Sequence, residues 1–177
     1  MRARKTLIAG RLSLDRSLRL RRGADATQRL LRNGALKSYP ILGVYWPVRG
    51  EIDVQELSLD HLGRGGRVAL PVVVAKSAPV EFWNWRPGMP MNRGVWNIPV
   101  PATREVVELD ALIVPLVGFD SKRYRLGYGG GYYDRTLAHA RRRPFCIGLG
   151  YQMGRLDSIF PQPHDIPMDV IVTDADP

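Results

Sequence analysis

At positions 125–135 the sequence reads Arg125-Leu126-Gly127-Tyr128-Gly129-Gly130-Gly131-Tyr132-Tyr133-Asp134-Arg135, between an apolar, strand-like run at 109–119 and a helix-like run at 132–141. We call residues 127–131 the glycine loop. Glycines at a strand-to-helix passage let the backbone approach a bound group closely, with N–H donors directed at it. The loop is therefore interpreted as the anion-binding wall of an active site, and the alternative is a tight turn without a ligand.

Further apolar runs flank this unit on both sides. They predict buried strands of the parallel-sheet kind at 41–46, 67–74, 145–150 and 170–172. Between 78 and 100, tryptophans alternate with prolines and glycines, which predicts an antiparallel excursion or a long lid over the sheet edge. The pattern predicts an α/β fold: a single domain over 1–177, with a three-layer, open, mostly parallel sheet and helices on both faces.

The first 38 residues are expected to form a helical region packed on that domain. Leucines at near-helical spacing predict a helix from Thr6 to about Arg22, ended by Gly23. Asp25 is expected to cap a second helix that runs to Leu36.

Composition limits the class of protein. The chain has 177 residues, a net charge of +9 and a single cysteine, Cys146, which lies in an apolar run and is expected to be an inert core residue. No apolar run is long enough for a membrane span, and no signal-peptide core follows Met1. We expect a cytoplasmic monomer with an anionic small-molecule partner and no membrane partner.

The common nucleotide motifs do not fit the glycine loop. No Lys-Ser or Lys-Thr follows it, as a Walker A motif requires, and Tyr132 stands where a dinucleotide fingerprint needs its third glycine. The sequence also has no nucleophile elbow and no cysteine–histidine metal spacing. These absences favour chemistry by positioning and electrostatics, as in phosphoryl transfer.

Several residues after the predicted strands have two possible roles each. Asp134 either caps the helix or holds a Mg²⁺ ion that bridges phosphates, with Asp165 as a second ligand. Glu51 is either a helix N-terminal charge or a ligand-binding acid beside Trp46. The aromatic side chains near them either form flat walls for an aromatic ligand or belong to the core.

The segments Leu112–Asp120 and Tyr124–Arg135 together resemble the signature of the 5-formyltetrahydrofolate cyclo-ligase family. Supporting matches are Tyr45-Trp46-Pro47, Gly50-Glu51-Ile52-Asp53, Leu70-Pro71-Val72-Val73, Trp85-x-Pro87-Gly88, Gly94 with Ile98-Pro99, and His164-Asp165-Ile166-Pro167-Met168-Asp169. The resemblance implies an ATP- and Mg²⁺-dependent reaction that converts 5-formyltetrahydrofolate to 5,10-methenyltetrahydrofolate, ADP and phosphate. It also implies an iminium phosphate intermediate, formed when the formyl oxygen attacks the γ-phosphate of ATP.

The resemblance also assigns roles to residues. It implies catalysis by Arg125, Tyr132 and Asp134, and Mg²⁺ binding by Asp134 and Asp165. The implied ATP-binding residues are Arg2, Arg4, Lys5, Arg125, Leu126, Gly127, Tyr128, Gly129, Gly130, Gly131, Tyr132 and Tyr133. The implied folate-binding residues are Trp46, Glu51, Tyr128, Gly129, Gly130, Gly131 and Tyr132.

The beginning of the chain departs from the family pattern, in which a lysine stands four residues before an ATP-contacting arginine. Arg4 takes the arginine position, and the lysine position falls before Met1. Either the start is truncated or misassigned, or Arg2 or Lys5 replaces the lysine. Two other functions stay open: a related enzyme with another substrate, against which Trp46 and Glu51 argue, and a basic nucleic-acid-binding module. The latter is disfavoured because the basic clusters contain no interleaved aromatic residues.

Overall fold

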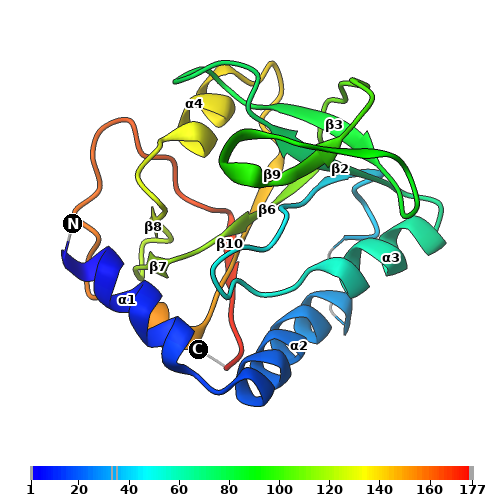
Figure 1. Cartoon of the computed structure of the whole chain (residues 1–177). Helices are drawn as coiled ribbons and strands as arrows, with labels where there is room; N and C mark the ends of the chain where they lie inside the picture. Colours follow the sequence, from blue (N-terminus) through cyan, green and yellow to red (C-terminus); the bar gives the residue numbers. More distant parts are fainter. Residues whose placement is uncertain (1, 33, 35, 176–177) are drawn as a thin grey trace.

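The computed structural model describes residues 2–32, 34 and 36–175, and within this part six strands form the main sheet, in the order β10-β9-β6-β1-β2-β3 (Figure 1). The strands are β1 (Ile41–Gly43), β2 (Arg67–Val72), β3 (Glu81–Trp85), β6 (Ala111–Pro115), β9 (Phe145–Leu149) and β10 (Val170–Val172). All neighbours are parallel except β2 and β3, which are antiparallel. The predicted open, mostly parallel sheet is confirmed.

Helices cover both faces of the sheet, as predicted (Figure 1). Side chains alternate across each strand, so Ile113 of β6 packs on the same side as α2 (Arg16–Arg32) and α3 (Gln55–Gly63). Its neighbour Leu112 packs with Leu137 of α4 (Tyr132–His139) on the opposite side. The two apolar clusters hold the C-terminal ends of the strands, and hence the loops that follow them, in fixed positions.

The first two helices divide at a different place from the one predicted. The helix α1 (Arg2–Ser13) ends before Asp15, whose Oδ1 accepts hydrogen bonds from the backbone N–H groups of Ser17 and Leu18 and so caps α2. Gly23 does not end a helix but lies buried within α2, where an added Cβ would stand 3.5 Å from Cγ2 of Ile52. Gly23 therefore serves close packing, and the predicted cap at Asp25 is wrong because that residue is inside α2.

The excursion after β2 is antiparallel, as predicted. The strand β3 pairs with β2, while β4 (Met91–Arg93) and β5 (Pro99–Pro101) form a separate hairpin around the 3-10 turn η1 (Val95–Asn97). Trp96 in this turn is 67% exposed, and its ring meets the ring of Tyr132 edge-on at 5.6 Å. The hairpin thus reaches the start of α4.

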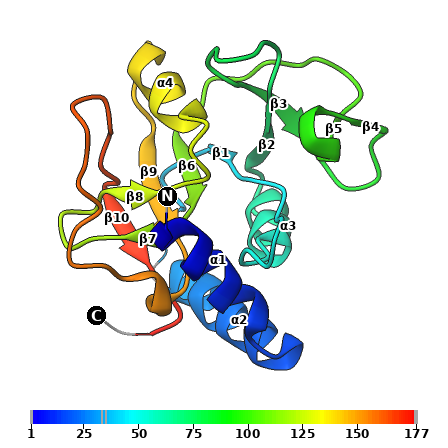
Figure 2. The same cartoon turned by 60° about the vertical axis from the view of Figure 1, so that its left-hand side comes forward.

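The predicted strand at 109–119 is two strands. After β6 the chain turns at 116–117 into β7 (Gly118–Phe119), which pairs antiparallel with β8 (Arg125–Leu126). A Cβ on Gly118 would stand 2.8 Å from Cδ1 of Leu7, so only glycine lets α1 pack this closely against β7. Figure 2 shows α1 beside β7 and β8. No helix among the described residues is both long and apolar enough to cross a membrane.

Candidate active site

Three loops leave the C-terminal ends of neighbouring parallel strands. They follow β1, β6 and β9, which is where ligands bind in open α/β sheets. Arg11 of α1 ties two of them together: its Nε donates to the carbonyl oxygen of Arg49 at 3.0 Å, and its Nη1 donates to that of Leu116 at 3.3 Å. The predicted convergence of the loops after β1 and β6 is therefore observed.

Glu51 and Tyr128, both predicted as folate-binding residues, are in direct contact. The Tyr128 hydroxyl donates to Oε1 of Glu51 at 2.8 Å and accepts from Nη2 of Arg11 at 2.7 Å. The other carboxylate oxygen, Oε2, accepts from the backbone N–H of Val48 at 2.8 Å. Burial raises the pKa of the Glu51 carboxyl and, together with the nearby Glu51 charge, raises the pKa of Tyr128 to about 12. Trp46, 37% exposed, lies in the same loop after β1.

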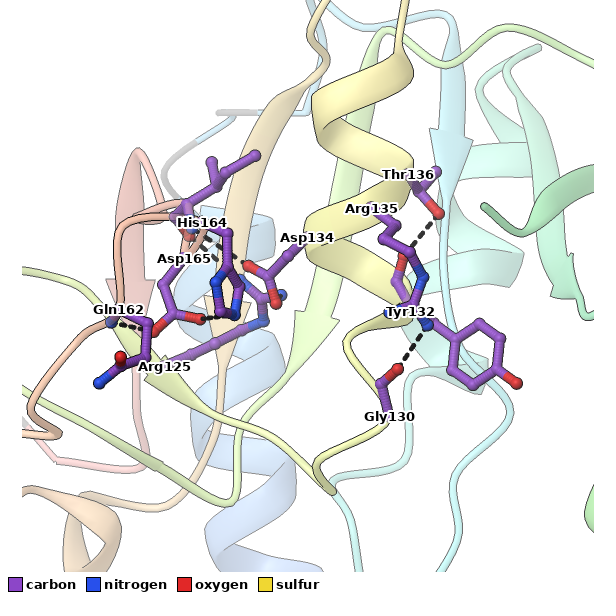
Figure 3. Close-up of polar contacts among 10 residues, drawn as sticks. Arg125, Gly130, Tyr132, Asp134, Arg135, Thr136, Gln162, His164 and Asp165 are labelled. Atoms are coloured by element: carbon purple, nitrogen blue, oxygen red, sulfur yellow. Dashed lines mark hydrogen bonds and ion pairs between the residues drawn. The ribbon is translucent and has the colours of Figure 1, made fainter. Parts of the chain in front are cut away.

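The glycine loop leads directly into α4. Gly129 and Gly131 have φ angles of 93° and 65°, in the left-handed region that favours glycine. Gly131 is the N-cap of α4 and offers no side-chain cap, which leaves the first N–H groups of the helix open to an anion. The guanidinium of Arg135 donates to the Gly130 carbonyl oxygen and stacks over the Tyr132 ring at 5.0 Å (Figure 3).

Arg4, predicted as an ATP-binding residue, lies on the glycine loop. Its Nε donates to the Gly127 carbonyl oxygen at 2.5 Å, and its Nη1 would stand 3.0 Å from a Cβ at Gly129. Arg2 and Lys5 are exposed on α1, and within the described part of the chain neither side chain forms a hydrogen bond or ion pair with the loop. The structure therefore brings one of the three predicted N-terminal cations to the site.

Asp134, predicted as a metal ligand, is engaged by an arginine. Its Oδ2 forms an ion pair with Nη2 of Arg125 at 2.8 Å, and its Oδ1 accepts from the backbone N–H of Ile166 at 3.1 Å. Arg125 also donates to the Ile166 carbonyl oxygen at 3.1 Å, and its side chain is only 6% exposed. Its guanidinium lies over the Tyr133 ring at 5.9 Å, and burial raises the pKa of that tyrosine.

Asp165 lies beside this pair. Its Oδ2 accepts from the backbone N–H of Gln162 at 2.7 Å, and its Oδ1 is 3.9 Å from Nε2 of His164. Figure 3 shows Arg125, Asp134 and Asp165 grouped on one side of the start of α4, with Gly130 and Tyr132 on the other. Among the described residues, no three His, Cys, Asp or Glu side chains come together as a metal site. The predicted pair of carboxylates is close, but Asp134 is already shared with Arg125.

Arg11 is a residue of this site that the sequence patterns did not predict. It is 4% exposed and donates to the Tyr128 hydroxyl, the residue that links the glycine loop to Glu51. A signal was available: Arg11 follows Leu7 by four positions and so falls on the face of α1 that packs against β7. A cation on an inward face of a helix indicates a buried polar contact.

Comparison with known proteins agrees with the fold and the motifs. The model of the 5-formyltetrahydrofolate cyclo-ligase family matches residues 1–174. The chain is 35% identical over 161 residues to the 5-formyltetrahydrofolate cyclo-ligase of Escherichia coli K12, which covers 85% of this chain and 87% of the relative. The corresponding protein of Haemophilus influenzae is 33% identical over 139 residues, 74% of each chain.

A solved structure extends the similarity to three dimensions. The 5,10-methenyltetrahydrofolate synthetase of Aquifex aeolicus superposes with a TM-score of 0.86 at 28% identity, over 99% of this chain and 89% of that one. Family motifs, sequence identity and fold thus agree along nearly the whole length. The chain belongs to the 5-formyltetrahydrofolate cyclo-ligase family.

Proposed function

We propose that this protein converts 5-formyltetrahydrofolate to 5,10-methenyltetrahydrofolate while ATP is converted to ADP and phosphate. The observation that carries the proposal is the 2.8 Å hydrogen bond between Tyr128 and Glu51. Tyr128 belongs to the glycine loop, which suits a phosphate, and Glu51 suits the N–H donors of a pterin. One residue thus connects the two ligand regions, as a reaction between ATP and a folate requires.

The phosphates are expected at the start of α4. The open N–H groups there, the left-handed glycines 129 and 131, and the guanidinium of Arg4 over the loop together make a site for an anion. Leu126, Gly127, Gly130 and Tyr133 complete the proposed ATP contacts. Arg125 is held by Asp134 and by the Ile166 carbonyl, which fixes its position beside the loop. Arg2 and Lys5 lie on the exposed face of α1 and would act only at long range.

The folate is expected over the loop after β1. Glu51 would accept from the pterin, while Trp46 and Tyr128, 37% and 38% exposed, present ring surface toward solvent on which a flat ligand can stack. Tyr132, with its ring between Arg135 and Trp96, borders the same region. The glycines of the loop leave room where the two substrates would meet.

Magnesium fits the carboxylates that are present. Asp134 and Asp165 lie on adjoining segments, and among the described residues Oδ1 of Asp165 has only a distant contact, 3.9 Å from His164. Mg²⁺ commonly takes one or two carboxylates and completes its shell with phosphate oxygens and water. Asp134 and Asp165 would therefore hold it with the nucleotide. When bound, Mg²⁺ would neutralise charge that develops on the phosphates.

In the proposed reaction both nucleophiles come from the substrate. The formyl oxygen attacks the γ-phosphorus and ADP leaves, which gives an iminium phosphate. N10 then attacks the former formyl carbon and loses its proton to solvent, and phosphate departs with the formyl oxygen. The chain's own residues bind, orient and exclude water. No protein nucleophile is needed, and Cys146 is not expected to act as one, because burial raises the pKa of its thiol to about 11 and keeps it unreactive.

The test follows methenyl absorbance after the purified protein is mixed with 5-formyltetrahydrofolate, ATP and Mg²⁺. We expect product only when all three are present, with one ADP formed per methenyl product. Absence of ATP-dependent product, in a preparation shown to be folded by its circular dichroism spectrum, would refute the proposal.

A further inference from the structure

Arg11 is a buried cation without a directly paired anion. It is 4% exposed, and among the described residues its hydrogen-bond partners are the carbonyl oxygens of Arg49 and Leu116 and the hydroxyl of Tyr128. Within the described part of the chain, no carboxylate lies within ion-pair distance of it. Buried charges are normally paired, because transfer from water is costly. The compensating charge must therefore be reached through one of these neutral partners.

Tyr128 supplies that connection. A hydroxyl has one proton, and since Arg11 donates to the Tyr128 oxygen, that proton is free to go to Glu51. Glu51 accepts through both carboxylate oxygens, from Tyr128 and from the N–H of Val48, so neither oxygen has a partner that would favour a proton on it. The two hydrogen bonds in series keep the Arg11 guanidinium within about 5.5 Å of the carboxylate.

We infer that Arg11 is a positioning residue: acting through Tyr128, it keeps Glu51 ionised and fixed, and so sets the pH range in which the folate binds. The inference rests on the proposed role of Glu51 in folate binding. Arg11 itself need not touch either substrate, because each of its three side-chain nitrogens donates to a group of the protein.

Of the two arginine charges that favour ionised Glu51, the charge of Arg11 has the larger effect. Burial raises the pKa of Glu51, while the hydrogen bonds from the Val48 N–H and the Tyr128 hydroxyl, and then the charges of Arg11 and Arg49, lower it. Arg49 is exposed and lies over the Tyr128 ring at 5.6 Å, so water screens its charge. The other facing groups are the phenols of Tyr45, Tyr128 and Tyr133, whose pKa values are all raised and which are neutral at working pH.

The experiment measures the pKa of Glu51 directly and then its effect on binding. Side-chain carboxyl carbons of ¹³C-labelled glutamate are titrated by NMR, and the Glu51 signal is assigned by its loss in Glu51→Gln. At an effective dielectric constant of about 20, a unit charge about 5.5 Å away changes the pKa of a carboxyl by about two. We expect Arg11→Met to raise the Glu51 pKa by about one to two units, and the pH below which the KM for 5-formyltetrahydrofolate rises should move up equally.

Matched variants separate charge from packing. Arg11→Lys keeps the charge and should retain the wild-type pH profile, while Arg11→Gln is neutral, keeps a donor, and serves if Arg11→Met does not fold. Arg16→Met, at an exposed arginine of α2, should change neither the Glu51 pKa nor the pH dependence of the KM for 5-formyltetrahydrofolate. An unchanged Glu51 pKa in both neutral variants, or an equal shift in Arg16→Met, would overturn the inference. If the wild type makes no methenyl product, the proposed function fails, yet the NMR titration still decides the role of Arg11.

Discussion

The Arg125–Asp134 ion pair is expected to contribute to both stability and activity, and Asp134→Asn tests this. The two side chains are 6% and 15% exposed and 2.8 Å apart. Removal of one partner leaves a buried, uncompensated charge, which typically costs about 3–5 kcal/mol. An asparagine can still accept the Ile166 N–H, so we expect the lower end, about 3 kcal/mol. With an m-value of about 2 kcal/mol/M, the urea midpoint would fall by about 1.5 M.

Urea unfolding followed by tryptophan fluorescence measures this change, and turnover is measured well below the transition. We expect turnover to drop sharply in Asp134→Asn while the fold persists. The double variant Arg125→Met/Asp134→Leu should recover part of the stability but none of the activity, because it removes the uncompensated charge and leaves the Ile166 N–H and carbonyl without these partners.

Asp60→Asn is the control, because it breaks the exposed Arg64–Asp60 pair on α3 and should change far less. A loss of less than about 1 kcal/mol of unfolding free energy in Asp134→Asn, or an active double variant, would refute the reasoning.

Three further predictions concern the loops of the site. Glu51→Gln should raise the KM for 5-formyltetrahydrofolate about tenfold, because it removes a hydrogen bond to a charged group. The KM for ATP should rise less than about twofold, and equal effects on both would count against the proposed role of Glu51. Because burial raises the Glu51 pKa, its contribution to stability is present below the ordinary pKa of 4.5 and is lost as pH rises through the folded value. The melting temperature of the wild type should therefore fall relative to that of Glu51→Gln as pH rises from about 4.5, and a constant difference would contradict this. Gly131→Ala should cost about 1–2 kcal/mol and weaken ATP binding, because Gly131 has φ 65° and its Cβ would stand 2.8 Å from Nη1 of Arg135; Gly63→Ala, in open space, is the control.

Apolar runs predicted the α/β architecture because buried parallel strands need continuous apolar residues on both faces. The runs around Ile113 and Ile147 are almost fully buried, and the order of helices and strands follows the sequence pattern. The glycine loop was also located correctly at the start of α4. Two of its glycines have backbone angles that few other residues adopt. Such a requirement can be recognised from a short stretch of sequence.

Tertiary contacts decided the features that sequence patterns missed. The chain after 115 changes its pairing to β8 where α1 packs against Gly118, and Gly23 lies inside a helix where Ile52 packs against it. Neither contact is visible in local periodicity. Likewise, nothing in the spacing of Arg125 and Asp134 indicates that they pair with each other around the backbone of Ile166. Side-chain pairing within the site depends on how distant segments fold together.

The most direct test of the central claim traces the formyl oxygen of the substrate. The protein is incubated with ATP, Mg²⁺ and 5-formyltetrahydrofolate that carries ¹⁸O in the formyl group, and the released phosphate is analysed by mass spectrometry. If the folate above Glu51 meets the nucleotide at the glycine loop as proposed, the formyl oxygen attacks the γ-phosphate, and each methenyl product is accompanied by one phosphate that contains ¹⁸O. Formation of unlabelled phosphate, or release of phosphate without the methenyl product, would contradict the account.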